Sequence, residues 1–172
     1  MNFLLRQWYA TGEERFKNSV EHTLTKMRLG GIWDHVGYGF HRYSTDEEWL
    51  LPHFEKMLYD QALMMIAYTE GWQVTRNPLF KKTVLEISEY VAQNLTHKQG
   101  GFFSAEDADS DGEEGKFYVW ETNEIDKVLS DSEAKTFKSA FNLKPEGNFE
   151  DEATKQLTGK NIPHLTEPLT EF

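Results

Sequence analysis

The chain has 172 residues, no cysteine and a formal net charge of −11, from 29 acidic and 18 basic residues. The length fits one domain, and the missing cysteines exclude disulfides, thiolate nucleophiles and cysteine-based zinc sites. The acidic balance disfavours partners with negative surfaces, such as nucleic acids and anionic membranes, and favours neutral ligands or cations.

The mean hydropathy of −0.66 and the absence of a long apolar run argue against a membrane span, which needs ~20 apolar residues. Residues Met1 to Arg6 lack the pattern of a secretory signal. We therefore expect a cytoplasmic protein.

The first elements in chain order are helical. Residues before Thr11 resemble the end of a helix, and Thr11 to Glu14 match a capping box that would begin the next one. Apolar residues then recur at helical spacing; they are Phe16, Val20, Leu24 and Met27. This helix is expected to end at Gly30-Gly31, because glycine adopts the left-handed conformation after a helix without a steric penalty.

The middle of the chain predicts two further long helices. A short β-ribbon or extended loop is expected around Tyr38 to Tyr43, before Pro52 opens a helix that runs to about Thr75. Asn77-Pro78 is typical of an N-cap and first helical residue, and it precedes an apolar stripe that ends before Gly100-Gly101. The stripe consists of Phe80, Val84, Ile87, Val91 and Leu95.

The last third predicts shorter elements. Thr122 and Ser130 or Asp131 are candidate caps of two short helices, and the periodicity disappears from Pro145 to Phe172, which predicts an irregular tail. The fold class that follows is all-α, built from antiparallel helical hairpins with only a short β-ribbon.

The two glycine pairs lie about seventy residues apart, and each precedes a loop rich in aromatic and titratable residues. If each pair ends a helix, the two loops leave equivalent ends of two helical units and meet around one mouth. We therefore expect function to lie in these loops.

The first loop and the residues after it carry His41, Arg42, His53, Lys56 and Asp60. On a helix that starts at Pro52, the last three of these residues share one face. Such a face can bind a polar substrate or transfer protons. A solvated, salt-bridged surface is the alternative interpretation.

The second loop contains Asp107, Asp109, Asp111 and Gly112, which match the first half of a calcium-binding loop. Tyr118 stands where such a loop needs its last glutamate, so a complete helix–loop–helix calcium site is not expected. A partial calcium site, a carboxylate-rich rim of an active site and a plain solvated loop remain open. Aromatic side chains such as Trp33, Tyr43 and Phe103 mostly suit core packing, but next to carboxylates they also suit a sugar-binding cleft.

Three segments resemble those of one family closely. They are GGIWDHVGYGFHRYSTDEEW, LPHFEKMLYDQALMMIAYTEGWQVT and GGFFSAEDADSDGEEGKFYVWE. The family is that of the YyaL-like, spermatogenesis-associated, thioredoxin-domain proteins. The resemblance implies a thioredoxin-like domain followed by a six-hairpin (α/α) toroid, similar to N-acylglucosamine epimerases and toroidal glycosidases. Residues 1–172 would then be a single domain that forms the first part of the toroid.

The resemblance also sets expectations for partners. A six-hairpin toroid needs about twelve helices, which is more than this chain offers. We expect an open half-ring whose natural partners are the remainder of the toroid and the thioredoxin-like domain. Alone, such a half-ring is expected to be a poor catalyst and to dimerise through its uncovered apolar faces.

The leading hypothesis is a carbohydrate-active domain, either a sugar isomerase or epimerase or a glycoside hydrolase, acting on a sugar or similar polar molecule. Proton transfer is assigned to His41, His53 and Asp60, with Glu106 or Asp107 as the partner carboxylate, all in a shared cavity. Substrate contacts are assigned to Arg42, Trp33, Tyr43, Lys56, Tyr59 and Phe103. No cofactor is expected, apart from the calcium alternative at Asp107, Asp109 and Asp111. The competing hypothesis is a non-catalytic toroid that binds a peptide or partner protein.

Overall fold

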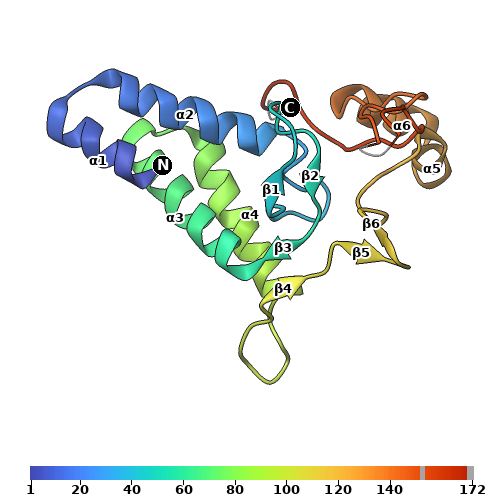
Figure 1. The fold of residues 1–172 in the computed structure, drawn as a ribbon, viewed down its shortest axis with the longest axis horizontal. Helices are drawn as coiled ribbons and strands as arrows, with labels where there is room; N and C mark the ends of the chain where they lie inside the picture. The colour runs from blue at the N-terminus through green and yellow to red at the C-terminus, as the bar shows by residue number, and fades with distance from the viewer. Residues whose placement is uncertain (152–153, 170–172) are drawn as a thin grey trace.

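The computed structural model describes residues 1–151 and 154–169. The first four helices form two antiparallel hairpins at one end of the molecule, and the last two helices lie at the other end (Figure 1). The helices are α1 (Asn2–Thr11), α2 (Glu14–Leu29), α3 (Leu58–Thr75), α4 (Pro78–Asn94), α5 (Thr122–Val128) and α6 (Asp131–Ala140). The helical fold class is confirmed. Within the described ranges, none of these helices has both the length and the apolar character that crossing a membrane requires.

The strands of the described residues are all two residues long and form three antiparallel pairs. β1 (Tyr43–Ser44) pairs with β2 (Pro52–His53), β3 (Lys56–Met57) with β4 (Ala105–Glu106), and β5 (Asp109–Ser110) with β6 (Glu113–Glu114). The expected ribbon is thus found slightly later in the chain, starting at Tyr43. The β3–β4 pair joins the second loop to the start of α3, which no local pattern predicts.

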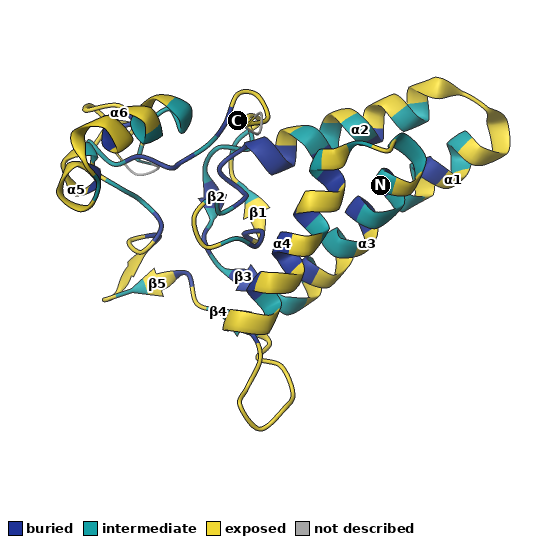
Figure 2. Ribbon diagram, turned by 180° about the vertical axis from the view of Figure 1, so that it is seen from behind, coloured by how far each residue is buried: buried dark blue, intermediate teal, exposed yellow. Residues whose placement is uncertain are grey.

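The core of the four-helix part is built from the predicted apolar stripes. Val20 and Leu24 of α2, Tyr68 of α3, and Phe80 and Ile87 of α4 are fully buried, as the dark blue segments of Figure 2 show for these helices. The hydroxyl of Tyr68 donates a 2.7 Å hydrogen bond to the carbonyl of Leu24, so this polar atom is satisfied inside the core. Burial of these side chains supplies the main stabilisation of the hairpins.

The described residues of the C-terminal segment, 145–151 and 154–169, contain no helix and pack against the rest of the chain. Asn161 is fully buried, and its side chain bonds the backbone of Trp120 and both the amide and the carbonyl of Lys144. A second apolar cluster joins this segment to the loops; its buried members are Phe54, Ala108, Tyr118 and Ile162. Side-chain hydrogen bonds therefore satisfy backbone N–H and C=O groups here, as backbone hydrogen bonds do in a helix.

Two predicted helix starts are wrong. Thr11 ends α1, and α2 begins at Glu14 with Glu13 as its N-cap. Pro52 lies in β2, because the carboxylate of Asp46 accepts the amides of Leu50 and Leu51 and holds this stretch in an extended loop. α3 begins only at Leu58, so His53, Lys56 and Asp60 do not share a helix face.

The caps of the other helices follow the prediction more closely. Asn77 accepts the amide of Leu79 and is followed by Pro78, and Ser130 forms a capping box with Glu133. The cap of α5 is Glu121, one residue before the predicted Thr122.

The two glycine pairs are not equivalent, contrary to the prediction. Gly30 follows α2 with φ of −69°, and a Cβ on Gly30 or Gly31 would lie 2.4 Å from the carbonyl oxygen of Trp49 or 2.1 Å from that of Leu50. These glycines are required by close backbone approach. Gly100 and Gly101 do have left-handed φ angles of 88° and 79°, but α4 has already ended at Asn94.

Candidate active site: a histidine between carboxylates

The candidate residues fall into a buried group around Lys56 and a more accessible group around His53. Lys56 is 1% exposed, and its Nζ lies 2.7 Å from Oδ2 of Asp34 and 2.8 Å from the carbonyl of Tyr38. The rings of Tyr90 and Tyr118 flank the ammonium at 4.7 Å each. Burial by itself raises the pKa of Asp34, but the charge of Lys56, its hydrogen bond and the hydrogen bond from the amide of Gly37 together outweigh burial and hold that pKa below its ordinary value. Lys56 is therefore part of a buried ion pair and not a free substrate ligand.

Glu106 stands opposite Lys56 in the β3–β4 register and is occupied on both oxygens. Its carboxylate accepts the hydroxyl of Tyr90 at 2.7 Å and that of Tyr118 at 2.5 Å. Burial, together with the bond to Glu106, raises the pKa of both tyrosines. Glu106 thus anchors two protonated tyrosines beside the ion pair.

His41 is buried in the same region. Its Nδ1 lies 2.9 Å from the carbonyl of Phe54, and its ring packs edge-on against Phe54 and Tyr118. Burial, followed by the charge of Lys56, lowers the pKa of His41 to about 3. His41 is consequently neutral at physiological pH, and it lines a different cavity from the one beside His53. Trp33 is also buried and lines the cavity of His41.

Acid should destabilise the fold through two buried histidines. Burial, and then the charge of Arg28, lower the pKa of His35 from 6.5 to about 4, while that of His41 falls to about 3. Below pH 6.5 these two histidines therefore bind protons in the unfolded chain but remain neutral in the folded chain until the pH approaches 4. The free energy of unfolding should fall as the pH drops from about 6.5 to about 4, by up to about 1.4 kcal/mol per pH unit for each histidine. Urea unfolding at a series of pH values measures this slope.

The matched variant for this prediction carries His35→Gln and His41→Gln, which remove both titrating groups. Its stability should depend less on pH in this window, while the exposed control His22→Gln should keep the slope of the parent chain. An unchanged slope in the double variant would show that other groups cause the acid sensitivity.

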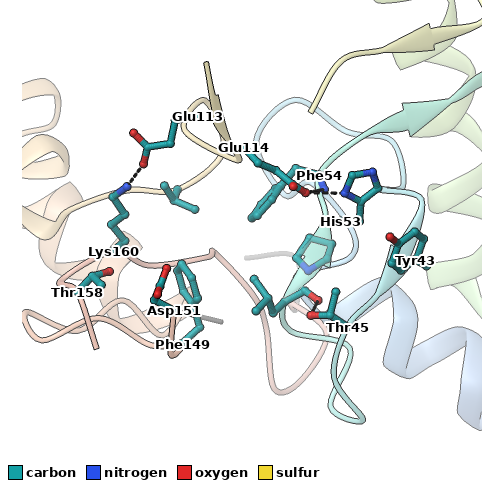
Figure 3. A pocket seen from close by; sticks show the side chains of 13 residues that line it. Tyr43, Thr45, His53, Phe54, Glu113, Glu114, Phe149, Asp151, Thr158 and Lys160 are labelled. Carbon is teal, nitrogen blue, oxygen red and sulfur yellow. Dashed lines mark hydrogen bonds and ion pairs between the residues drawn. The ribbon is translucent and has the colours of Figure 1, made fainter. Parts of the chain in front are cut away.

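His53 has two carboxylates at its two ring nitrogens. Its Nδ1 lies 2.5 Å from Oε1 of Glu114, and its Nε2 lies 3.8 Å from Oε2 of Glu55. Tyr43, its partner in the β1–β2 register, stacks on the ring at 5.1 Å between centroids. The amide of Phe54 also donates to Glu114, which fixes the carboxylate that orients the histidine (Figure 3).

A cavity of about 370 Å³ opens beside His53. Figure 3 shows His53 and Glu114 on one wall and the ion pair of Lys160 with Glu113 on the opposite wall. The lining mixes aromatic and hydrogen-bonding side chains; besides those already named, it includes Tyr43, Thr45, Phe149, Asp151 and Thr158. Aromatic faces and carboxylates together suit a ligand with both C–H faces and hydroxyl groups.

Arg42, Tyr59 and Asp60 lie at the side of this site, near the start of α3. Arg42 is bonded to Glu55 at 2.8 Å, and this hydrogen bond raises the pKa of the guanidinium. Burial raises the pKa of Asp60, the charge of Arg42 opposes that effect, and Glu55 adds to it. Tyr59 is half exposed. Glu55 thus links Arg42 to His53.

Within the described part of the chain, the acidic loop contains no group of three or more His, Asp or Glu side chains placed to hold a metal ion. Asp107 accepts the amide of Asp109, and Asp111 pairs with Lys116 at 2.9 Å. Calcium binding here stays a prediction. Phe103, half exposed, packs against His97 instead of the cavity beside His53.

The sequence interpretation missed Glu114, Lys160 and Phe149. Glu114 belongs to the acidic loop that was singled out, and only the β5–β6 turn shows which of its carboxylates reaches His53. Lys160 and Phe149 lie in the segment for which no periodicity was found, so no sequence signal identified them.

No family model matches the chain. Spermatogenesis-associated protein 20 of Mus musculus and that of Homo sapiens are each 45% identical to it over 139 residues, which cover 75% of the chain. This segment is homologous to part of spermatogenesis-associated protein 20. The uncharacterized protein B0495.5 of Caenorhabditis elegans is 43% identical over 130 residues. The resemblance to this family is confirmed, and the chain spans 18% of the length of these relatives.

A solved structure gives the fold type. The crystal structure of D-mannose isomerase matches with a TM-score of 0.51 and 19% identity, over 60% of this chain and 27% of that one. At this identity the match shows the fold alone. The chain thus has the helical-hairpin architecture of the toroid type.

Proposed function

We propose that the cavity beside His53 binds a sugar and that His53 transfers protons in its isomerisation. The observation that carries this proposal is the contact between His53 and Glu114, 2.5 Å long, in the wall of a cavity lined by aromatic and hydroxyl-binding side chains. The likeness of the fold to that of D-mannose isomerase supports the same chemical class.

The geometry suggests how the histidine would act. A carboxylate at Nδ1 holds the proton on that nitrogen and leaves the lone pair of Nε2 free as a base. Nε2 would take the proton from C2 of an open-chain aldose, and the electron pair would form the C1–C2 double bond of an enediol while O1 takes up a proton. O2 then gives a proton to water as the C2 carbonyl forms, which balances the proton that O1 took from water. Nε2, whose own proton exchanges with solvent in between, delivers a proton to C1. Glu114 and Glu55 would stabilise the imidazolium between the two steps.

The charges around the cavity favour an uncharged sugar. Arg42 is paired with Glu55 and Lys160 with Glu113, so both cations are already neutralised by carboxylates. A phosphate or carboxylate on the substrate would have to compete with these pairs. A neutral hexose needs only hydrogen bonds and stacking, which the lining supplies.

Incubation with D-mannose in D2O tests the proposal, both for this chain and for a complete relative of it. We expect NMR to show deuterium at C1 of a ketose product and at C2 of recovered aldose. Binding of the sugar without any exchange, even by the complete protein, would favour the non-catalytic binding module over the enzyme. Absence of both binding and exchange would contradict a sugar site altogether.

A further inference from the structure

A second cavity, of about 260 Å³, lies next to the first and is not used by the proposed reaction. Phe54 lines both cavities. The walls of the second cavity are mainly aromatic rings, contributed by Trp33, Phe54, Phe117, Tyr118 and Trp120. Rings of this kind offer flat apolar faces to a flat apolar ligand.

The charged and titratable groups in the wall of the second cavity already have partners. The carboxylate of Asp34 binds Lys56 and also accepts the amides of Val36 and Gly37 at 2.9 Å and 2.8 Å. The Nε2 of His35 lies 3.1 Å from two backbone carbonyls, and burial lowers its pKa to about 4, so this ring is neutral. A charged ligand would gain nothing from these groups and would lose its hydration.

Two ring nitrogens in this wall can form a directional polar contact: the buried indole Nε1–H of Trp33, which has no partner among the described residues, and Nε2 of His41. The Nδ1 of His41 faces the carbonyl of Phe54 at 2.9 Å and must carry the proton, because a carbonyl only accepts. Nε2 is then a hydrogen-bond acceptor, and within residues 1–151 and 154–169 no donor to it is recorded. With a pKa of about 3, the imidazole keeps this lone pair at any physiological pH.

We propose that the second cavity binds a neutral, planar aromatic molecule that donates an N–H or O–H hydrogen bond to Nε2 of His41. The size agrees, because an apolar cavity of about 150 Å³ already accommodates benzene. A two-ring molecule therefore fits into about 260 Å³. This site is separate from the sugar site and does not depend on the proposed isomerisation.

The matched probes for this proposal are indole and benzofuran, which have nearly the same shape but differ in the N–H donor. Isothermal titration calorimetry of the whole chain should show indole binding about five-fold more tightly, as expected for one net hydrogen bond. His41→Phe keeps an aromatic ring and removes the acceptor. In this variant the two probes should bind equally, while the exposed control His22→Phe should retain the preference for indole.

Two further measurements test the proposal if His41→Phe fails to fold. Val36 is 55% exposed and lines the cavity, so Val36→Trp should close it and abolish binding of both probes without disturbing the core. In the unmodified chain, the preference for indole should be the same at pH 5.5 and pH 8, since His41 stays neutral over this range. Equal affinity of the two probes in the unmodified chain, or unchanged binding by Val36→Trp, would overturn the proposal.

Discussion

Replacing His53 with asparagine should lower the rate of sugar isomerisation by about 10²–10⁴-fold, the usual contribution of a general acid–base residue. Asparagine retains hydrogen bonding towards Glu114 but cannot accept and return a proton at the position of Nε2. The measurement is the rate of deuterium incorporation from D2O at saturating sugar. Sugar affinity should change far less than the rate, because the cavity lining is otherwise intact.

His22→Asn is the matched control, since His22 is exposed on α2 and does not line the cavity beside His53. It should leave the exchange rate unchanged. Glu114→Gln should also lower the rate, because the base remains but the carboxylate that holds the proton on Nδ1 is removed. Retention of the full rate by His53→Asn would show that another group carries the proton.

Replacing Lys56 with methionine should lower the free energy of unfolding by about 3–5 kcal/mol, as expected when one partner of a buried ion pair is removed. The variant would leave the carboxylate of Asp34 buried without its cation, 2.7 Å from where Nζ lay. It would also remove the cation between the rings of Tyr90 and Tyr118. Urea unfolding followed by circular dichroism measures the loss.

Two comparisons separate the buried charge from other effects of this change. The double variant Lys56→Met with Asp34→Asn should recover part of the stability, because no unpaired charge is then buried. Lys116→Met breaks an exposed pair with Asp111 and should leave the unfolding midpoint almost unchanged. A Lys56→Met variant as stable as the parent chain would mean that the ion pair contributes nothing net.

The sequence identified the features that depend on neighbouring residues. The stripes that contain Val20 and Leu24, and Phe80 and Ile87, are buried as their spacing predicts, since helical geometry places every third or fourth side chain on one face. The cap at Asn77 was readable for the same reason, because a cap is satisfied by residues two or three positions away.

Prediction from neighbouring residues was wrong where contacts with distant parts of the chain determine the local conformation. Pro52 is a favourable first residue of a helix, yet it lies in β2. β1 pairs with this stretch, and the carboxylate of Asp46 accepts the amide of Leu51 just before it. α2 does end just before Gly30, as predicted, but Gly30 is not left-handed, and the close approach of residues 49 and 50 is the reason for the two glycines. Neither contact leaves a period or a motif in the sequence.

By itself, the sequence determined the helical hairpins, the family and the loops in which titratable residues gather. The tertiary structure alone decided which of those residues meet: His53 joins Glu114 across 61 positions, while His41, Lys56 and Glu106 are drawn into a buried network. The physical reason is that helix formation is set by contacts within a turn. The site is set instead by pairs of two-residue strands, whose register depends on the packing of the whole chain.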